Sequence, residues 1–191
     1  MKLVSTLLAT SIAVFGSTQV MAYEAGDIMV KAGIINVAPK DDSGISGVKV
    51  KDDTQLGLTG TYMVTSQVGI EVLAATPFKH TIEAGGNRIA TTKHLPPTVS
   101  VQYYPLDSAS VIQPYVGAGL NMTLFFDESD GIVLEDSFGL SVSAGANYHI
   151  DDNWMANVGI WYIDIDTDIK GSNNTVEIDP LVVMVGAGYK F

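Results

Sequence analysis

Most of the chain alternates between hydrophobic and polar residues with a period of two. Such alternation is typical of β-strands, whose successive side chains point to opposite faces of a sheet. Eight segments follow the pattern, at residues 27–37, 54–64, 67–74, 98–104, 113–125, 138–149, 153–164 and 175–191. After the first residues, no apolar run approaches the length of a transmembrane helix. The pattern predicts an all-β protein, which is either a soluble sandwich or a membrane barrel.

The connections between these segments alternate between long and short. The long, polar connections are residues 38–53, 75–97, 126–137 and 165–174, and the shorter ones are residues 65–66, 105–112 and 150–152. Four long extracellular loops and three short periplasmic turns are the arrangement of an eight-stranded antiparallel transmembrane β-barrel. A soluble sandwich gives no reason for this regularity. We therefore predict the barrel.

One face of every predicted strand carries no Asp, Glu, Lys or Arg. In the last strand this face consists of Leu181, Val183, Val185, Ala187, Tyr189 and Phe191. A charge at the middle of a bilayer would cost about 2–4 kcal/mol, so a membrane barrel requires such a face. Aromatic residues fall near the short-turn ends, where an aromatic girdle is expected: Tyr62, Tyr103, Tyr148, Trp154 and Tyr189.

The opposite face of the strands predicts a lumen with two layers. The layer nearer the short turns is polar and contains Lys31, Glu71 and Gln102, with small glycines around them. The layer nearer the long loops is apolar and contains Ile35, Leu73, Phe125, Trp161 and Met184. An eight-stranded barrel is too narrow for an aqueous channel. The apolar side chains therefore either plug the barrel or bind apolar ligands.

The first residues read as an export signal. Lys2 precedes an apolar stretch at residues 3–15, and Val20, Met21 and Ala22 form a cleavage site before Tyr23. We expect a signal peptide at residues 1–22 and a single barrel domain at residues 23–191. The net charge of −11 makes nucleic acid an unsuitable partner, because nucleic-acid affinity comes largely from Lys and Arg. The chain has no cysteine, which excludes disulfides and thiol chemistry.

No motif for catalysis, metal binding or cofactor binding stands out. His80 and His94 lie in the second long connection without a nucleophile elbow or a metal-ligand spacing, and we interpret them as surface residues. A run of alternating aspartates, Asp164, Asp166 and Asp168, lacks the glycine and closing glutamate of a calcium-binding loop. We interpret these aspartates as a solvated barrel rim. The prediction is therefore a protein that is not an enzyme, with no cofactor and no metal site.

Several ordered blocks of the sequence carry a resemblance to a known family. They are Thr54 to Thr59, Glu71 to His80, Lys93 to Thr98, Pro114 to Asn121, Asp152 to Trp154, Trp161 to Thr167, Ile178 to Pro180 and the terminal Gly188-Tyr189-Lys190-Phe191. Together they cover essentially the whole chain after the signal segment. The sequence resembles the outer membrane protein W (OmpW) family.

This resemblance implies a barrel in the bacterial outer membrane with a hydrophobic lumen that carries small apolar molecules. It implies that Leu73 and Trp161 form a hydrophobic constriction. It also implies that the terminal aromatics, Tyr189 and Phe191, are recognised by the barrel-assembly machinery. The expected partners are outer-membrane lipid, small hydrophobic ligands and that machinery.

The function predicted from the sequence is passive conduction of small hydrophobic molecules, with lateral exit into lipid as one route. The alternative is a structural barrel with a plugged lumen, whose loops contact phage, bacteriocins or host surfaces. A lipid-modifying enzyme with the same architecture is a third class, which hydrolysis or acyl transfer on lipid that disappears with His94→Ala would support.

Overall fold

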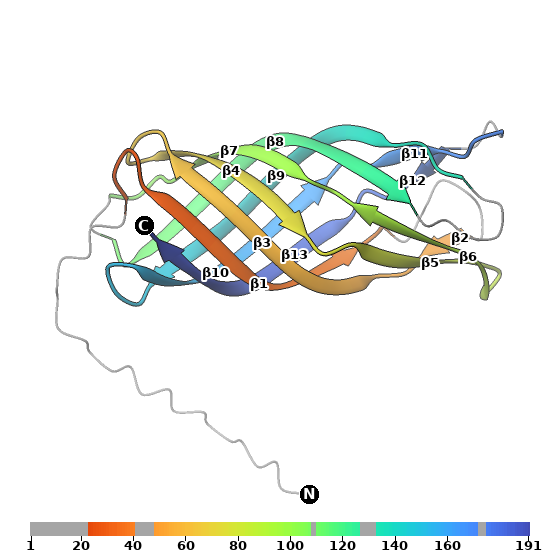
Figure 1. Cartoon of the computed structure of the whole chain (residues 1–191), viewed down its shortest axis with the longest axis horizontal. Helices are drawn as coiled ribbons and strands as arrows, with labels where there is room; N and C mark the ends of the chain where they lie inside the picture. The colour runs from red at the N-terminus through yellow and green to blue at the C-terminus, as the bar shows by residue number, and fades with distance from the viewer. Residues whose placement is uncertain (1–22, 41–47, 108–109, 127–132, 172–174) are drawn as a thin grey trace, which may run out of the picture.

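The computed structural model describes residues 23–40, 48–107, 110–126, 133–171 and 175–191 (Figure 1). The predicted signal peptide, residues 1–22, lies outside the described residues. The barrel wall consists of β1 (Ile28–Ala38), β3 (Asp53–Met63), β4 (Val68–Ala75), β7 (Thr98–Tyr103), β8 (Ile112–Phe126), β9 (Ser137–His149), β10 (Trp154–Ile163) and β13 (Leu181–Lys190). The remaining strands are β2 (Val48–Val50), β5 (Phe78–Ala84), β6 (Asn87–Leu95), β11 (Asp166–Asp168) and β12 (Thr175–Glu177). Within the described part of the chain, no helix is long and apolar enough to cross a membrane.

The wall is a closed antiparallel sheet. Its strands follow one another in the order β8, β7, β4, β3, β1, β13, β10, β9, and a further pairing of β8 with β9 closes the ring. The first and last wall strands pair along ten residues, from Met29 opposite Lys190 to Ala38 opposite Leu181. Closure leaves none of these strands as an unpaired edge. The eight-stranded antiparallel barrel predicted from the sequence is therefore confirmed.

The two faces of the wall differ as the alternation predicts. Outward residues are apolar and exposed, and Val185 in the middle of β13 is 61% exposed. Inward residues on the same strand, such as Val182 and Met184, are buried. The wall thus presents an apolar band outside and a packed interior inside.

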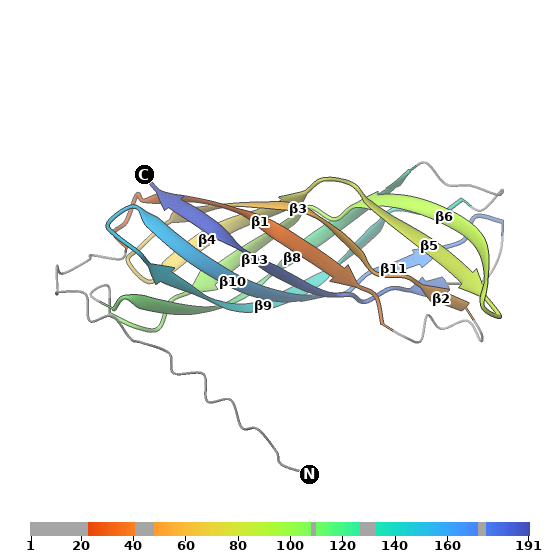
Figure 2. The ribbon, with the colours of Figure 1, turned by 90° about the horizontal axis from the view of Figure 1, so that it is seen from below.

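The prediction of a polar loop at residues 75–97 is wrong. These residues form β5 and β6, a hairpin that turns at Gly85 and Gly86, both with positive φ. The hairpin continues beyond the barrel at the end opposite the C-terminus (Figure 1, Figure 2). It is held on one side by β2 and on the other by β8, where Lys93 lies opposite Phe126. The long connection is therefore an extension of the wall.

The last predicted strand, residues 175–191, is also not continuous. It is divided into β12, which pairs with β11, and β13, which belongs to the wall. Between them lie Asp179, with φ of 34°, and Pro180. Proline has no N–H to donate to a ladder and restricts the residue before it, so the strand is interrupted at this point.

We expect Val185→Arg to lower the free energy of unfolding in a bilayer by about 2–4 kcal/mol, because a charge placed at the midplane must leave water. Urea titration of the barrel in lipid vesicles measures the effect. The control is Ser66→Arg in an exposed short turn, which should change the stability by less than about 1 kcal/mol. Equal effects of the two substitutions would contradict the assignment of the outward band to lipid.

Candidate functional site in the barrel lumen

The half of the lumen nearer the β5–β6 hairpin is filled by apolar side chains, which we call the outer apolar cluster. Its buried members are Ile35, Val37, Leu73, Phe78, Trp161, Ile163, Ile165, Val176, Ile178, Val182 and Met184, and Phe125 packs against them half-buried. All five apolar lumen residues singled out in the sequence thus meet in one place. The members that sequence reasoning missed follow the same alternation or, like Phe78, lie in the segment interpreted as a loop.

Trp161 forms the base of this cluster because a neighbouring glycine leaves space for its ring. A Cβ atom on Gly159 would lie 2.4 Å from Cη2 of Trp161, so any larger residue would displace the indole. The ring is 1% exposed, and its Nε1 has no hydrogen-bond partner. Trp161 therefore presents a buried aromatic surface with an unpartnered donor, and its role in the constriction that the family resemblance implies stays a prediction.

Below the cluster lies a polar layer centred on a buried ion pair. Lys31 Nζ lies 2.8 Å from Glu71 Oε2, and both side chains are essentially inaccessible to solvent. Lys31 Nζ also lies 5.1 Å from the centre of the Tyr115 ring, a cation–π distance. Gln102 belongs to the same layer, where its Oε1 accepts a hydrogen bond of 2.7 Å from Tyr104 Oη. The three polar residues predicted for this half are all buried.

A third layer, absent from the sequence-based prediction, closes the end nearer the short turns. We call it the tyrosine floor; it consists of Tyr23, Tyr104, Tyr115, Met29, Met63 and Met155. Tyr23 Oη accepts a hydrogen bond of 2.6 Å from Asn147 Nδ2, and its ring packs edge-on against Tyr104. Tyr23 precedes the first strand, so the alternation gave no signal for its burial.

The wall has a seam between β4 and β7. Their pairing ends at Leu73 opposite Thr98, and pairing on this side resumes only at Phe78 opposite His94 in the hairpin. Residues 74–77 and 95–97 are not paired with each other along this gap. Two of the latter are Pro96 and Pro97, which have no N–H to donate.

A small cavity of about 10 Å³ lies at the seam, with room for about one water molecule. It is lined by Ile35, Val37, Leu73, Ala74, Ala75, Phe78, Pro96, Ile163 and Val182. These residues belong both to the outer apolar cluster and to the wall. The lumen and the seam are thus in direct contact.

The interpretation of His80 and His94 as surface residues is wrong, because both are only 1% exposed. They lie on β5 and β6, which extend the wall, and their side chains point into the space above the outer apolar cluster. The rings stack with centroids 4.8 Å apart and an interplanar angle of 10°. Burial lowers the pKa of His80 and lowers that of His94 to about 3, so both rings are neutral.

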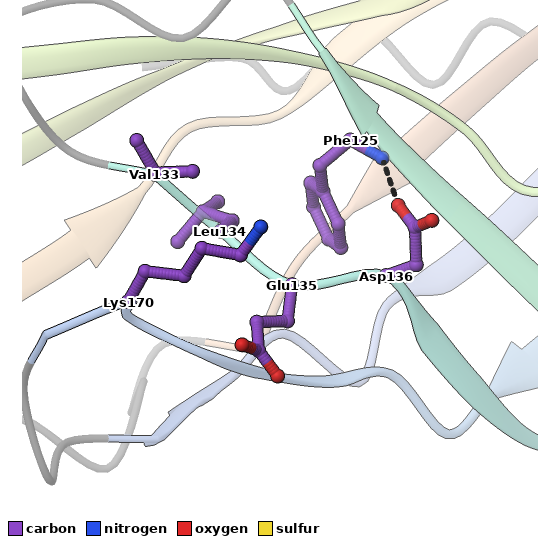
Figure 3. Close-up of a pocket in the computed structure, with 6 residues that line it drawn as sticks. All are labelled: Phe125, Val133, Leu134, Glu135, Asp136 and Lys170. Atoms are coloured by element: carbon purple, nitrogen blue, oxygen red, sulfur yellow. Dashed lines mark hydrogen bonds between the residues drawn. The ribbon is translucent and has the colours of Figure 1, made fainter.

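A pocket opens at the outer end of the barrel (Figure 3). It has a volume of about 470 Å³ and is lined by Phe125, Val133, Leu134, Glu135, Asp136 and Lys170. Figure 3 shows the Phe125 ring between β8 and the segment of Leu134, with its backbone N–H donating to Asp136 Oδ1 over 3.1 Å. The Phe125 ring also lies 5.8 Å from that of His94. One aromatic ring therefore separates the pocket from the buried histidines.

The three alternating aspartates that follow β10 do not form one group in the structure. Asp164 and Asp166 lie beside Asp179, and their carboxylate oxygens fall within 4.8 Å of one another. Lys40 forms an ion pair of 2.9 Å with Asp179. Asp168 instead accepts a hydrogen bond from Thr175. The positive charge of Lys40 therefore neutralises part of the negative charge of this acidic rim.

The terminal aromatics are placed where an assembly signal would be accessible. Phe191 is exposed, and its ring contacts that of Tyr189 at 4.8 Å. Tyr189 in turn contacts Trp154 at 5.1 Å. Recognition of Tyr189 and Phe191 by the assembly machinery stays a prediction.

We expect Lys31→Met to lower the free energy of unfolding by about 3–5 kcal/mol, because it leaves the Glu71 carboxylate buried without its partner. The double substitution Lys31→Met with Glu71→Gln should recover most of this loss. Equilibrium unfolding in urea measures both. As a control, Lys40→Met breaks a partly exposed ion pair and should cost no more than about 1 kcal/mol. A double variant as unstable as the single one would show that the ion pair is not the cause.

Comparison with known proteins agrees with this architecture. The sequence model of the OmpW family matches residues 24–191 of the chain. Outer membrane protein W of Vibrio cholerae serotype O1 is 42% identical over 94% of this chain and 95% of that protein, and its counterpart in Escherichia coli K12 is 40% identical over 97% and 98%. The crystal structure of OprG from Pseudomonas aeruginosa superposes with a TM-score of 0.81 at 37% identity, over 90% of this chain and 99% of that one. The chain therefore belongs to the OmpW family of bacterial outer-membrane β-barrels.

Proposed function

We propose that this barrel binds small apolar molecules in its outer apolar cluster and releases them sideways into the lipid of the outer membrane. The observation that carries the proposal is the cavity at the seam. It is lined by lumen residues such as Leu73 and by wall residues such as Ala74 and Pro96. A ligand in the cluster therefore already touches the place where the wall lacks ladder pairing.

Burial of apolar surface supplies the driving force for binding. Each square ångström of apolar surface removed from water contributes about 25 cal/mol. The walls of the outer apolar cluster come from β1, β4, β5, β10, β12 and β13, so a ligand there would be enclosed on several sides. The proposal needs no cofactor and no covalent step.

The inner layers make passage from end to end unfavourable. A ligand moving inward from Trp161 would meet the Lys31–Glu71 ion pair, which would have to separate while buried from solvent. Beyond it lies the tyrosine floor, whose side chains are packed and hydrogen-bonded. Lateral movement through the seam requires neither group to move, and we therefore favour it.

The alternative is a structural barrel whose lumen is simply filled. One observation favours it: the seam cavity holds only about one water molecule, so a ligand must displace side chains to enter. In that case the long loops rather than the lumen would carry the function, as contact sites for phage, bacteriocins or host surfaces. The two proposals predict different effects on ligand binding for substitutions inside the outer apolar cluster.

We expect Leu73→Asp or Trp161→Asp to weaken binding of n-octane at least tenfold, because each places a charged group in the apolar binding surface. Binding is measured by NMR on the barrel in lipid nanodiscs, with empty nanodiscs as the reference. Thr59→Val, a lumen substitution outside the cluster, is the matched control and should leave octane binding unchanged. Unaltered octane binding in both Asp variants, with the barrel folded, would favour the structural barrel.

Closing the seam tests the exit route. Cysteines at Ala74 and Pro96, in a chain that otherwise has none, can be joined by a short crosslinker. We expect crosslinking to slow octane transfer into vesicle lipid about tenfold or more while octane still binds, because the ligand can reach the cluster but not leave it. The control pair is Val101 and Ala118, which face each other in the intact β7–β8 ladder. Transfer that is equally fast in both crosslinked barrels would exclude lateral release.

A further inference from the structure

The two buried histidines lie in the centre of an aromatic stack at the outer end of the lumen. His94 contacts three rings: His80 at 4.8 Å, Phe78 at 5.5 Å and Phe125 at 5.8 Å. Phe78 belongs to the outer apolar cluster, and Phe125 lines the open pocket (Figure 3). A ligand passing from the pocket to the cluster would therefore move along the imidazole rings.

Three of the four ring nitrogens of these histidines have no hydrogen-bond partner. His80 Nδ1 contacts the backbone carbonyl oxygen of Lys51, which requires a proton on Nδ1 and leaves Nε2 as an acceptor. His80 Nε2 has no hydrogen-bond partner, and neither ring nitrogen of His94 has one. A neutral imidazole carries one donor and one acceptor. The stack thus offers a buried donor on His94 and buried acceptors on both rings.

A metal ion does not account for these nitrogens. The lone pairs of an imidazole lie in the plane of its ring, and the two planes are inclined by only 10°. Because the rings are stacked in nearly parallel planes, a single ion cannot lie in the planes of both rings. Among the described residues, the group of three potential ligands close enough to share an ion is Asp164, Asp166 and Asp179 at the rim, and it does not include the histidines.

An ionised ligand group is also a poor match. Burial keeps both imidazoles uncharged, so they would not compensate the charge of a carboxylate or a phosphate. The flanking rings of Phe78 and Phe125 are apolar. A hydroxyl group, in contrast, is neutral, donates one hydrogen bond and accepts others. It could accept a hydrogen bond from the N–H of His94 or donate one to His80 Nε2.

We propose that His80 and His94 form a subsite for the hydroxyl group of a neutral alcohol whose apolar tail occupies the outer apolar cluster. The inference rests on the proposed binding of apolar molecules and adds the ligand class. An alkane would leave the unpartnered ring nitrogens as they are, whereas an alcohol of the same length would satisfy one of them. The barrel should therefore prefer alcohols to alkanes by more than their solubilities in lipid predict.

The test compares octan-1-ol with n-octane on the full barrel in lipid nanodiscs, with partition into empty nanodiscs subtracted. We expect His94→Phe to lower the ratio of octanol affinity to octane affinity about three- to tenfold, the effect of losing one net hydrogen bond. In the unsubstituted barrel, octanol but not octane should shift the ¹⁵N resonances of the His94 ring. Thr92→Val is the matched control: it removes a buried polar group from the same hairpin and should leave the ratio unchanged.

A second measurement separates binding from a purely structural role. Without ligand, His94→Phe should raise the urea midpoint of the hairpin, because it removes buried polar atoms that have no partners. A lower midpoint would show that the ring nitrogens are already satisfied and would overturn the proposal. An unchanged affinity ratio, or ¹⁵N resonances that do not respond to octanol, would overturn it as well while octane still binds. If neither compound binds the unsubstituted barrel, the proposed function itself fails.

Discussion

Closure of the backbone ladder is the constraint on which the rest of the structure depends. Inside a bilayer no water pairs with an exposed N–H or C=O group, so the first and last strands must pair with each other. β1 and β13 do so along ten residues. A closed wall of eight strands leaves an interior just wide enough for side chains. Closure therefore also fills the lumen, with Tyr115, Trp161 and Met184 among the residues that occupy it. Any passage must move side chains or cross the wall.

At the seam between β4 and β7, the backbone ladder of the wall is interrupted. Pro96 and Pro97 carry no N–H, so interrupting the ladder beside them leaves no donor unpaired on that side. The β5–β6 hairpin resumes pairing at Phe78 and His94, which limits the gap to a few residues. Ala74, on the other side of the gap, has a side chain too small to cover it. At the seam the wall can therefore separate at a low free-energy cost, while the remaining strand pairings hold the barrel closed.

The eight wall strands could be predicted because lipid requires one uniformly apolar face, which makes the period of two visible in every strand. The β5–β6 hairpin was missed because its outward face, with Lys79 and Glu83, is polar and resembles a loop. The signal was nevertheless present, since Phe78, His80 and Ile82 alternate with those residues and are buried. Tyr23 could not be placed, because it precedes the first strand and has no periodic neighbours. The seam could not be predicted from the sequence, because two adjacent prolines do not reveal which strand end lies opposite them.

Buried polar atoms without a hydrogen-bond partner occur in both halves of the lumen, among them Glu71 Oε1 and Gln102 Nε2 in the inner half, but their surroundings differ. In the inner half, Lys31 pairs with Glu71, and Asn147 bridges Tyr23 and Asn157 through hydrogen bonds of 2.6 and 2.7 Å. In the outer half, Trp161 Nε1 and both ring nitrogens of His94 lie among apolar side chains without partners. Apolar residues of similar shape would fill these outer positions at no loss of stability. A lumen that served only as a plug would have no use for such polar atoms, whereas a binding surface gains selectivity from them. The proposed ligand site in the outer half would use its unpartnered atoms, whereas the polar groups of the inner half belong to a network of ion-paired and hydrogen-bonded side chains.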